Sequence, residues 1–373
     1  MDTRDVRYYS SLYGGYWSHD VRDFCYMTNQ YFPPDSFIEA LTRRLTRLVK
    51  SYPSTNWYLS SLAARPLGLT HEELVIANGA SELISTISDR FVSRLAVAVP
   101  TFDEFVNRAV NQGKSVSSFQ LTGELHLDVD EFARFVLESG ANAALLINPN
   151  NPTGLSTSKA DVLRFLDTLH GLDLVIVDES FIDFVDVDPH PSIMPHLSDY
   201  PNVIVLKSLS KTYGIPGLRL GYAASANQGR IAELRTHLPI WGINSLAQFY
   251  LETIEEYRQE FIESCAEVRR ATRLLHDGLR DDVPYLDPRP THANFVFSRV
   301  ADDLTSTELT TRLFEQSRIL INDCGRKRGL DGRYVRMASR TAEENAQLVE
   351  ALADLARSGV VLGAASAAGG AQR

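Results

Sequence analysis

The segment KSLSKTYGIPGLRLG, residues 207–221, places a lysine just after an apolar run. The residues VIVL before it are typical of a buried strand, so the polar residues leave that strand at its carboxyl end. Lys211 stands there beside serines, and Arg219 follows eight residues later. An amine in a crowded, partly desolvated place is a nucleophile that can form a Schiff base with an aldehyde. The segment therefore predicts a covalent anchor at Lys211.

Three further polar clusters follow apolar runs in the same way. In NGASE, residues 78–82, the backbone amides of Ala80 and Ser81 would open a helix and face an anion. NPNNPTG, residues 148–154, forms a tight turn that presents side-chain amides. DES puts the carboxylate of Asp178 at a strand's exit from the core. Because ligands of open α/β sheets bind at the carboxyl ends of strands, we expect the clusters to line one crevice.

This set of side chains predicts a site for a phosphorylated cofactor that carries an aldehyde and a pyridinium ring. A buried acid such as Asp178 holds a pyridinium nitrogen protonated, which makes the ring an electron sink. Serines, an arginine and helix-terminal amides bind a phosphate group, and an aromatic ring from PTF at 100–102 stacks on the cofactor. The expected phosphate ligands are Ala80, Ser81, Ser208, Ser210 and Arg219.

Short β-branched runs alternate with segments of helical period before residue 245. The intervening segments repeat apolar residues every three to four positions. Strict alternation predicts an α/β fold of three layers, with helices on both faces of a mostly parallel central sheet. The expected strands are 73–77, 94–100, 141–148, 172–180 and 202–208.

After Asn244 the pattern changes to one long amphipathic helix over 245–279, or two helices end to end. Apolar runs at 292–300, 317–325 and 333–340, followed by a helical segment at 341–357, predict a smaller α+β domain. The expected divisions are an N-terminal arm at 1–35, a large cofactor-binding domain at 36–245, a small domain at 246–358 and a flexible tail at 359–373.

Charge and composition exclude several classes of function. The net charge is −10 and like charges form no long run, so we expect no nucleic-acid partner. No segment approaches the roughly 20 apolar residues of a membrane span, and the start has no apolar leader. The three cysteines suit a reducing compartment, and the nine histidines show no metal-ligand spacing. These features predict a cytoplasmic enzyme with a small-molecule substrate and no metal.

The motifs NPNNPTG, VDESF, SLSK and RLGY, with Arg219, resemble the signature positions of fold-type I pyridoxal-phosphate enzymes, the class I/II aminotransferase superfamily. The resemblance is greatest to the histidinol-phosphate aminotransferase and threonine-phosphate decarboxylase branch. It extends from about Gly14 to Leu355. It implies an aspartate aminotransferase-like fold and a homodimer with shared active sites.

The resemblance also implies roles around the cofactor. Lys211 matches the lysine that carries pyridoxal phosphate as a Schiff base, and Asp178 matches the acid that pairs with the ring nitrogen. Asn151 matches the amide that bonds the ring hydroxyl, and Phe102 matches the aromatic residue that stacks on the ring.

Further matches concern the substrate and the second subunit. Arg336 matches the arginine that binds the substrate carboxylate, and Asn29 matches an asparagine on the substrate side. Tyr52 matches a tyrosine that reaches the cofactor phosphate of the neighbouring subunit.

Three residues depart from the family pattern. Phe181 replaces a tyrosine that bonds the cofactor's ring hydroxyl in many aminotransferases. Tyr13 and Asn322 replace a histidine and an arginine that the threonine-phosphate decarboxylases use for substrate phosphate. Four cationic side chains are candidates for binding a second anionic group, namely Arg326, Lys327, Arg328 and Arg340.

Two reactions are compatible with this set of residues. Transamination is the commonest chemistry on such a scaffold, so the main prediction is an aminotransferase acting on an α-amino or α-oxo acid. Acids that carry a phosphate or phosphonate group are among the candidate substrates. Phe181 and the C-terminal resemblance favour the alternative, a decarboxylase of a phosphorylated or phosphonate amino acid.

Two other classes of protein are alternatives for the same segment. Ser208-Leu209-Ser210-Lys211 satisfies the S-x-x-K motif of penicillin-recognising serine hydrolases, but the SDN and KTG elements of those enzymes do not follow. A non-enzymatic binding module is the remaining alternative, if the lysine does not engage a cofactor.

Overall fold

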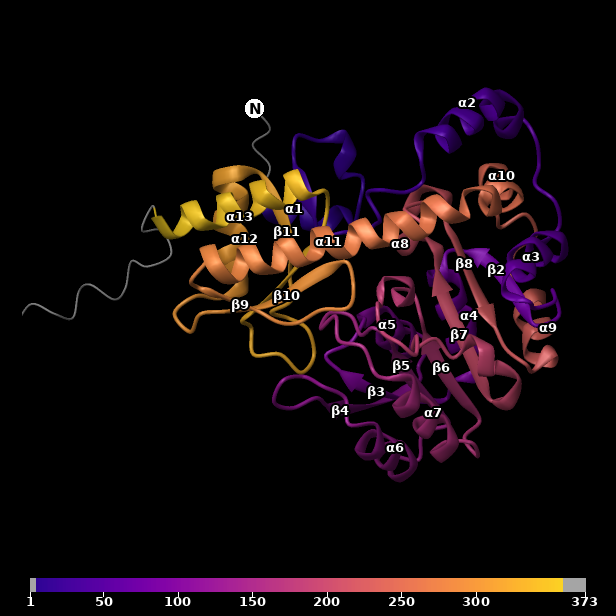
Figure 1. The fold of residues 1–373 in the computed structure, drawn as a ribbon. Coiled ribbons are helices and arrows are strands. Elements are labelled where there is room, and N and C mark those ends of the chain that lie inside the picture. The colour runs from indigo at the N-terminus through magenta and orange to yellow at the C-terminus, as the bar shows by residue number, and fades with distance from the viewer. Residues whose placement is uncertain (1–4, 358–373) are drawn as a thin grey trace, which may run out of the picture. The chain divides into compact units, whose positions relative to one another are not determined.

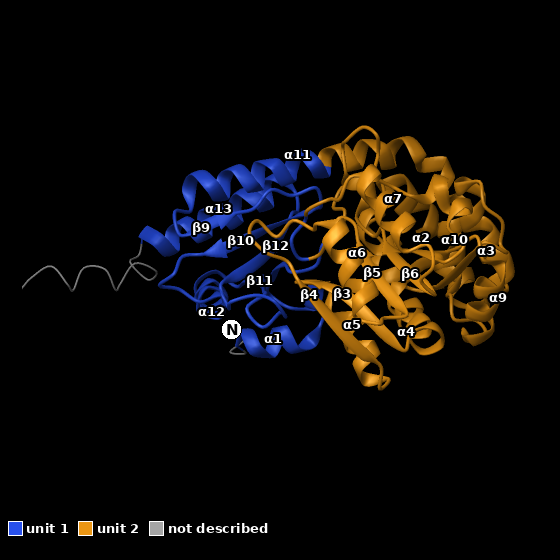
Figure 2. Ribbon diagram, turned by 90° about the horizontal axis from the view of Figure 1, so that it is seen from below, with its two compact units in different colours: residues 1–27, 152–154, 268–373 blue, residues 28–151, 155–267 orange. Residues whose placement is uncertain are grey.

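The computed structural model describes residues 5–357 and divides the chain into two compact units. Unit 1 comprises residues 1–27, 152–154 and 268–373, and unit 2 comprises residues 28–151 and 155–267 (Figure 2). The expected domain boundary near residue 245 stays a prediction. The expected flexible tail at 359–373 lies outside the described residues.

Unit 2 contains a seven-stranded sheet with the strand order β2-β8-β7-β6-β5-β3-β4. Strand β8 runs antiparallel to both of its neighbours, and the other neighbouring pairs are parallel. The strands are β2 (Leu74–Asn78), β3 (Arg94–Val99), β4 (Ser115–Gln120), β5 (Ala143–Ile147), β6 (Leu174–Asp178), β7 (Val203–Ser208) and β8 (Leu220–Ala224).

Both faces of the sheet are buried at its central strands, because successive residues of these strands enter different cores. In β6, Leu174 and Ile176 belong to one hydrophobic core, and Val175 and Val177 belong to the other. Helices α4 (Ala80–Phe91), α5 (Asp103–Asn111) and α9 (Gln228–His237) supply the first core. The second core receives α2 (Asp35–Val49), α3 (Asn56–Ala64), α6 (Val129–Glu138), α7 (Lys159–Thr168) and α10 (Ser245–Thr253).

Unit 1 is built on a five-stranded sheet with the order β1-β11-β12-β10-β9. Its strands are β1 (Arg22–Phe24), β9 (Leu286–Pro288), β10 (Phe295–Val300), β11 (Ile319–Asp323) and β12 (Tyr334–Ala338). Strand β1 pairs in parallel with β11, whereas the other pairs are antiparallel. The helices are α1 (Val6–Leu12), α12 (Ser306–Ser317), α13 (Ala342–Arg357) and the C-terminal part of α11 (Arg258–Asp282).

The three-layer α/β fold with a mostly parallel sheet is confirmed. The segment expected as one long helix, or two end to end, forms α10 and α11, which are labelled in Figure 1. The 3-10 turn η6 (Ile254–Tyr257) separates the two helices. Strand β4 was not predicted, because its sequence SVSSFQ carries few apolar residues and lies at the edge of the sheet. The sheet places the ends of β6 and β7 side by side, with Asp178 opposite Leu206.

Candidate active site

The turn after β7 positions the predicted anchor lysine. Ser208 ends the strand, and the short helix α8 (Leu209–Thr212) carries Ser210 and Lys211. Both serines are buried, and Lys211 is partly buried. The carbonyl oxygen of Lys211 accepts a hydrogen bond of 2.9 Å from the amide of Asn29. The backbone at the lysine is therefore fixed from both sides of α8.

Asp178 lies at the end of the neighbouring strand and is almost fully buried. Burial raises its pKa from 3.8 to about 6, because a carboxylate is poorly solvated there. Hydrogen bonds from Ser180 and an electrostatic interaction with Lys211 oppose that rise. Asp178 and Lys211 thus lie close enough to influence each other, as a cofactor held between an acid and an amine requires.

The N-terminus of α4 and Arg219 together form an anion cradle. Gly79 precedes the helix with φ 79°, and a Cβ at this position would collide with the guanidinium group of Arg219. A Cβ at Gly221 would come within 2.5 Å of the amide nitrogen of Ala80. Nη1 of Arg219 also reaches Oγ of Ser210 at 3.4 Å. Helix amides, an arginine and a serine hydroxyl therefore converge, as phosphate binding requires.

The asparagine-rich loop after β5 is held by its own side chains. Oδ1 of Asn148 accepts the amide of Thr157 at 2.9 Å, and Nδ2 of Asn150 donates to the carbonyl of Pro100 at 3.1 Å. The second bond joins this loop to the segment that bears Phe102, the N-cap residue of α5. Asn151 is buried within the loop. Asn151 and Phe102 therefore stand on loops that leave neighbouring strands of one sheet, β5 and β3.

Asn29 and Tyr52 complete the predicted residues of unit 2. The amide nitrogen of the Asn29 side chain donates to the carbonyl of Thr212 and to Oγ of Ser264, both at 2.9 Å. The Asn29 side-chain amide therefore hydrogen-bonds to other residues of the chain. Its predicted role in substrate binding stays a prediction. Tyr52 is exposed, with its ring 4.6 Å from that of Trp241.

Arg336 belongs to unit 1, where it lies on β12 and is buried. Its Nη2 donates to the carbonyl of Cys25 at 2.9 Å, and its guanidinium group lies 5.5 Å from the ring centre of Phe295. Arg340, one of the four cationic candidates, binds Glu344 at 2.9 Å and the carbonyl of Asp23 at 3.1 Å. Arg340 is therefore engaged within unit 1.

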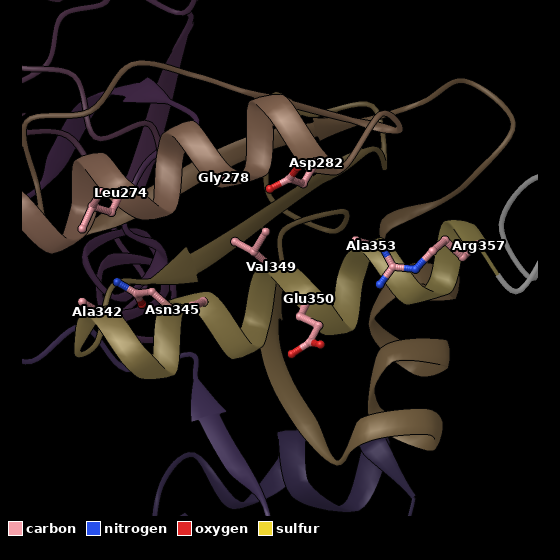
Figure 3. Close-up of a pocket in the computed structure, with 10 residues that line it drawn as sticks. Leu274, Gly278, Asp282, Ala342, Asn345, Val349, Glu350, Ala353 and Arg357 are labelled. Carbon is pink, nitrogen blue, oxygen red and sulfur yellow. The ribbon is translucent and has the colours of Figure 1, made fainter.

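A separate groove of about 600 Å³ lies between α11 and α13 in unit 1 (Figure 3). Val349 and Asn345 of α13 point toward α11, where Gly278 permits the close approach of Val349. The lining contains none of the predicted site residues.

Two features of the site could not be singled out from sequence. The pairing of Gly79 with Arg219 joins residues 140 positions apart, and the sequence predicted only the neighbouring amides of Ala80 and Ser81 as anion ligands. Ser180 stands inside the DES motif and bonds Asp178. No sequence signal showed that its hydroxyl faces the acid.

The donor set fits pyridoxal 5′-phosphate. Gly79 leaves room that a Cβ would fill, Arg219 and the α4 amides are suited to the phosphate, and the buried acid Asp178 is suited to a ring nitrogen. These residues lie in the one unit that also holds Lys211.

Comparison with known proteins decides the family. Residues 20–352 match the model of aminotransferase class I and II. The chain belongs to this family. Its members use pyridoxal 5′-phosphate, so the chain is a pyridoxal-phosphate-dependent enzyme, and both the predicted branch and the predicted cofactor are confirmed.

Two curated relatives are similar over most of this chain. It is 38% identical over 351 residues to the CMP-5'-(3-aminopropyl)phosphonate synthase of Streptomyces rubellomurinus, covering 94% of this chain but only 55% of the synthase. The chain thus spans about half the length of that relative. It is 31% identical to the L-serine phosphate decarboxylase of Sulfurospirillum multivorans, covering 88% of this chain and 87% of that protein.

A solved structure shows the same fold. A decarboxylase from Sulfurospirillum multivorans superimposes with a TM-score of 0.84 at 28% identity, covering 91% of this chain and 89% of that one. Within residues 5–357, no helix has the length and apolar character to cross a membrane. The same described residues contain no cluster of three or more His, Cys, Asp or Glu arranged for a metal ion.

The raised pKa of Asp178 predicts how the stability of the cofactor-free protein depends on pH. Asp178 binds a proton more tightly in the folded state than in the unfolded state, so its contribution to stability is most favourable below pH 4 and is lost as pH rises through about 6. The loss attributable to Asp178 is about 3 kcal/mol. We expect Asp178→Asn to be more stable than the wild type by less than about 1 kcal/mol at pH 4 and by about 3 kcal/mol at pH 7.

Urea unfolding of the two cofactor-free proteins between pH 4 and pH 7 measures this difference. Asp89→Asn, which changes an exposed carboxylate of α4, is the control measured over the same pH range. A constant difference for Asp178→Asn would show that Asp178 titrates normally.

The cradle predicts that Gly79→Ala weakens cofactor binding. The added methyl group collides with Arg219 and forces the positive φ on a residue with a Cβ, at a combined cost of about 1–3 kcal/mol. We expect the cofactor dissociation constant to rise about 10- to 100-fold. Gly68→Ala is the matched control, because Gly68 has φ 71° and no atom lies within 4 Å of where its Cβ would stand. Equal effects of both substitutions on cofactor affinity, measured by titration, would refute the cradle.

Proposed function

We propose that the chain is a pyridoxal-phosphate-dependent decarboxylase of an α-amino acid that carries a phosphate or phosphonate group. The observation that supports it is the pair of relatives, of which one is named for a phosphonate amine and the other for decarboxylation of a phosphorylated amino acid. The main sequence prediction, an aminotransferase, is not confirmed. The name of the serine phosphate decarboxylase favours the alternative reaction, and the name of the synthase favours a phosphonate group.

Bound pyridoxal phosphate supplies an electron sink for the pair of electrons left when a bond at Cα breaks. In the proposed reaction the Cα–carboxylate bond breaks, carbon dioxide leaves, and Cα receives a proton, so the product is a primary amine. The outcome depends on which bond is held perpendicular to the ring, a matter of angstrom-scale placement. The chain's contribution is therefore to orient the substrate and to manage protons.

We assign these tasks to residues already described. Lys211 would hold the cofactor covalently, and its Nζ would be the group that holds and moves the proton at Cα. Asp178 keeps the ring nitrogen charged, and Arg336 holds the substrate carboxylate. Phe181 is buried and has no hydroxyl to offer the cofactor's ring oxygen. The loop cations Arg326, Lys327 and Arg328 are the candidates for the phosphate or phosphonate group of the substrate.

The two reactions differ in their products. The purified holoenzyme is incubated with O-phosphoserine, O-phosphothreonine and phosphonate amino acids, each beside its unphosphorylated analogue. We expect carbon dioxide release in equal amount to the primary amine, only with the anionic substrates, and no accumulation of the pyridoxamine form of the cofactor. Conversion to the pyridoxamine form without carbon dioxide would establish transamination and overturn the proposal.

We also propose that the enzyme is a homodimer of the kind that the family resemblance implies. The side chains of Tyr52, Ile240 and Trp241 are large, apolar or aromatic, and more than half exposed. Such an exposed cluster is typical of an association surface. The prediction of a cytoplasmic location remains untested.

The dimer proposal predicts that a charge in this cluster separates the subunits. Ile240→Asp should reduce the mass measured by light scattering to that of one chain, because it buries a carboxylate in the interface. Leu137→Asp, at an exposed position of α6, is the control and should leave the mass unchanged. A single-chain mass for the wild type would contradict the proposal.

A further inference from the structure

The hydroxyl of Ser180 joins the ends of two neighbouring strands. Strands β6 and β7 are paired through Asp178 and Leu206, and the amide of Glu179 extends the pairing by donating to the carbonyl of Leu206 at 2.9 Å. At the next position along β7, the acceptor is a side-chain oxygen of the segment after β6 and not a backbone carbonyl. The amide of Ser208 donates to Oγ of Ser180 at 2.9 Å.

The hydrogen bond from Ser208 occupies the Ser180 oxygen as an acceptor and leaves its hydroxyl hydrogen for a different partner. Its oxygen accepts from Ser208, and its one hydrogen is directed to Oδ1 of Asp178 at 2.5 Å. The backbone amide of Ser180 donates to the same oxygen at 2.9 Å. All three residues are buried. Within residues 5–357, no hydrogen bond ends on the other carboxylate oxygen, Oδ2.

We propose that Ser180 is a positioning residue for the cofactor acid, which holds Asp178 through Oδ1 so that Oδ2 is presented to the ring nitrogen. Through Ser208 it ties that orientation to the backbone from which α8 and Lys211 begin. The proposal rests on the assignment of Asp178 as cofactor acid, and it does not depend on whether the enzyme decarboxylates or transaminates.

The surrounding charges agree with this role. Both hydrogen bonds from Ser180 lower the pKa of Asp178 against the effect of burial, and Lys211 is the charged group that acts on it. The nearby ion pair between Lys207 and Asp183, at 2.7 Å, acts instead on the pKa of Glu179. Ser180 is therefore the neutral donor that keeps the carboxylate of Asp178 ionised in a buried place.

Ser180→Ala removes the hydroxyl, and Ser180→Thr restores it. We expect Ser180→Ala to raise the cofactor dissociation constant about 10- to 100-fold, the usual effect of losing a hydrogen bond to a charged group. In the cofactor-free protein the pKa of Asp178, obtained from the pH dependence of stability relative to Asp178→Asn, should rise above its wild-type value. Ser180→Thr should return both quantities to within a few-fold of wild type.

Ser192→Ala is the matched control, because the hydroxyl of Ser192 donates to another buried carboxylate of the same segment, Glu179, at 2.7 Å. It should change neither the cofactor affinity nor the titration of Asp178. Equal effects of Ser180→Ala and Ser192→Ala, or failure of Ser180→Thr to restore either quantity, would overturn the proposal. Cofactor affinity and the pKa of Asp178 are both measured without substrate. Failure of this proposal can therefore be distinguished from failure of the proposed reaction.

Discussion

Lys211→Ala is expected to abolish the yellow colour of the bound cofactor and to lower turnover by about 10⁴-fold. The amine is both the covalent attachment point and the group that moves the substrate proton, and a positioned acid–base group contributes up to about 10⁴ in rate by itself. Absorbance spectra and single-turnover assays of the purified variant measure the two losses.

Lys50→Ala provides the control, because Lys50 is exposed at the end of α2 and outside the site. It should keep full colour and activity. A Lys211→Ala protein that stays yellow and active would show that another amine carries the cofactor.

Asp178→Asn is expected to lower turnover of the holoenzyme by about 100- to 1,000-fold. The substitution keeps the shape of the side chain but removes the charge that holds the ring nitrogen protonated. Breaking a buried charge pair costs about 2–5 kcal/mol, and each 1.4 kcal/mol corresponds to tenfold. Steady-state kinetics at saturating cofactor isolates the effect on chemistry from the effect on binding.

The opposite signs of two effects make this substitution informative. The same change that lowers turnover should stabilise the cofactor-free protein at pH 7, because a buried carboxylate is removed. A variant that loses activity and stability together would instead indicate a damaged fold.

The arrangement of β6 and β7 could be predicted from the sequence for a simple physical reason. A parallel sheet buried on both faces needs continuous apolar strands, and LVIV and VIVL satisfy that requirement. The polar residues that follow, Asp178 and Lys211, must then leave at the same edge of the sheet. The edge strand β4 escaped prediction, because a strand with one neighbour does not need a fully apolar sequence.

Contacts between distant segments could not be predicted in the same way. Gly79 and Arg219 meet because β8 returns antiparallel between β2 and β7, a register that no local pattern specifies. The direction of the Ser180 hydroxyl depends on the amide of Ser208, which lies on another strand. Such bonds follow from tertiary structure, so they become visible only once the sheet is assembled.

The choice between transamination and decarboxylation could not be predicted from the catalytic residues. The same lysine and acid serve transamination and decarboxylation, and from sequence only Phe181 and the C-terminal resemblance favoured the second. The proposal of decarboxylation depends on the similarity to proteins that are named as decarboxylases.

Chemical trapping of the cofactor tests the central claim most directly. The holoenzyme is reduced with borohydride, digested with trypsin and mapped by mass spectrometry. A reduced cofactor on Lys211 blocks cleavage after that residue, so the account predicts a labelled peptide spanning residues 208–219. A labelled peptide that ends at Lys211 would contradict the account, because cleavage there shows that Lys211 itself is unmodified. The absence of any labelled peptide would also contradict it.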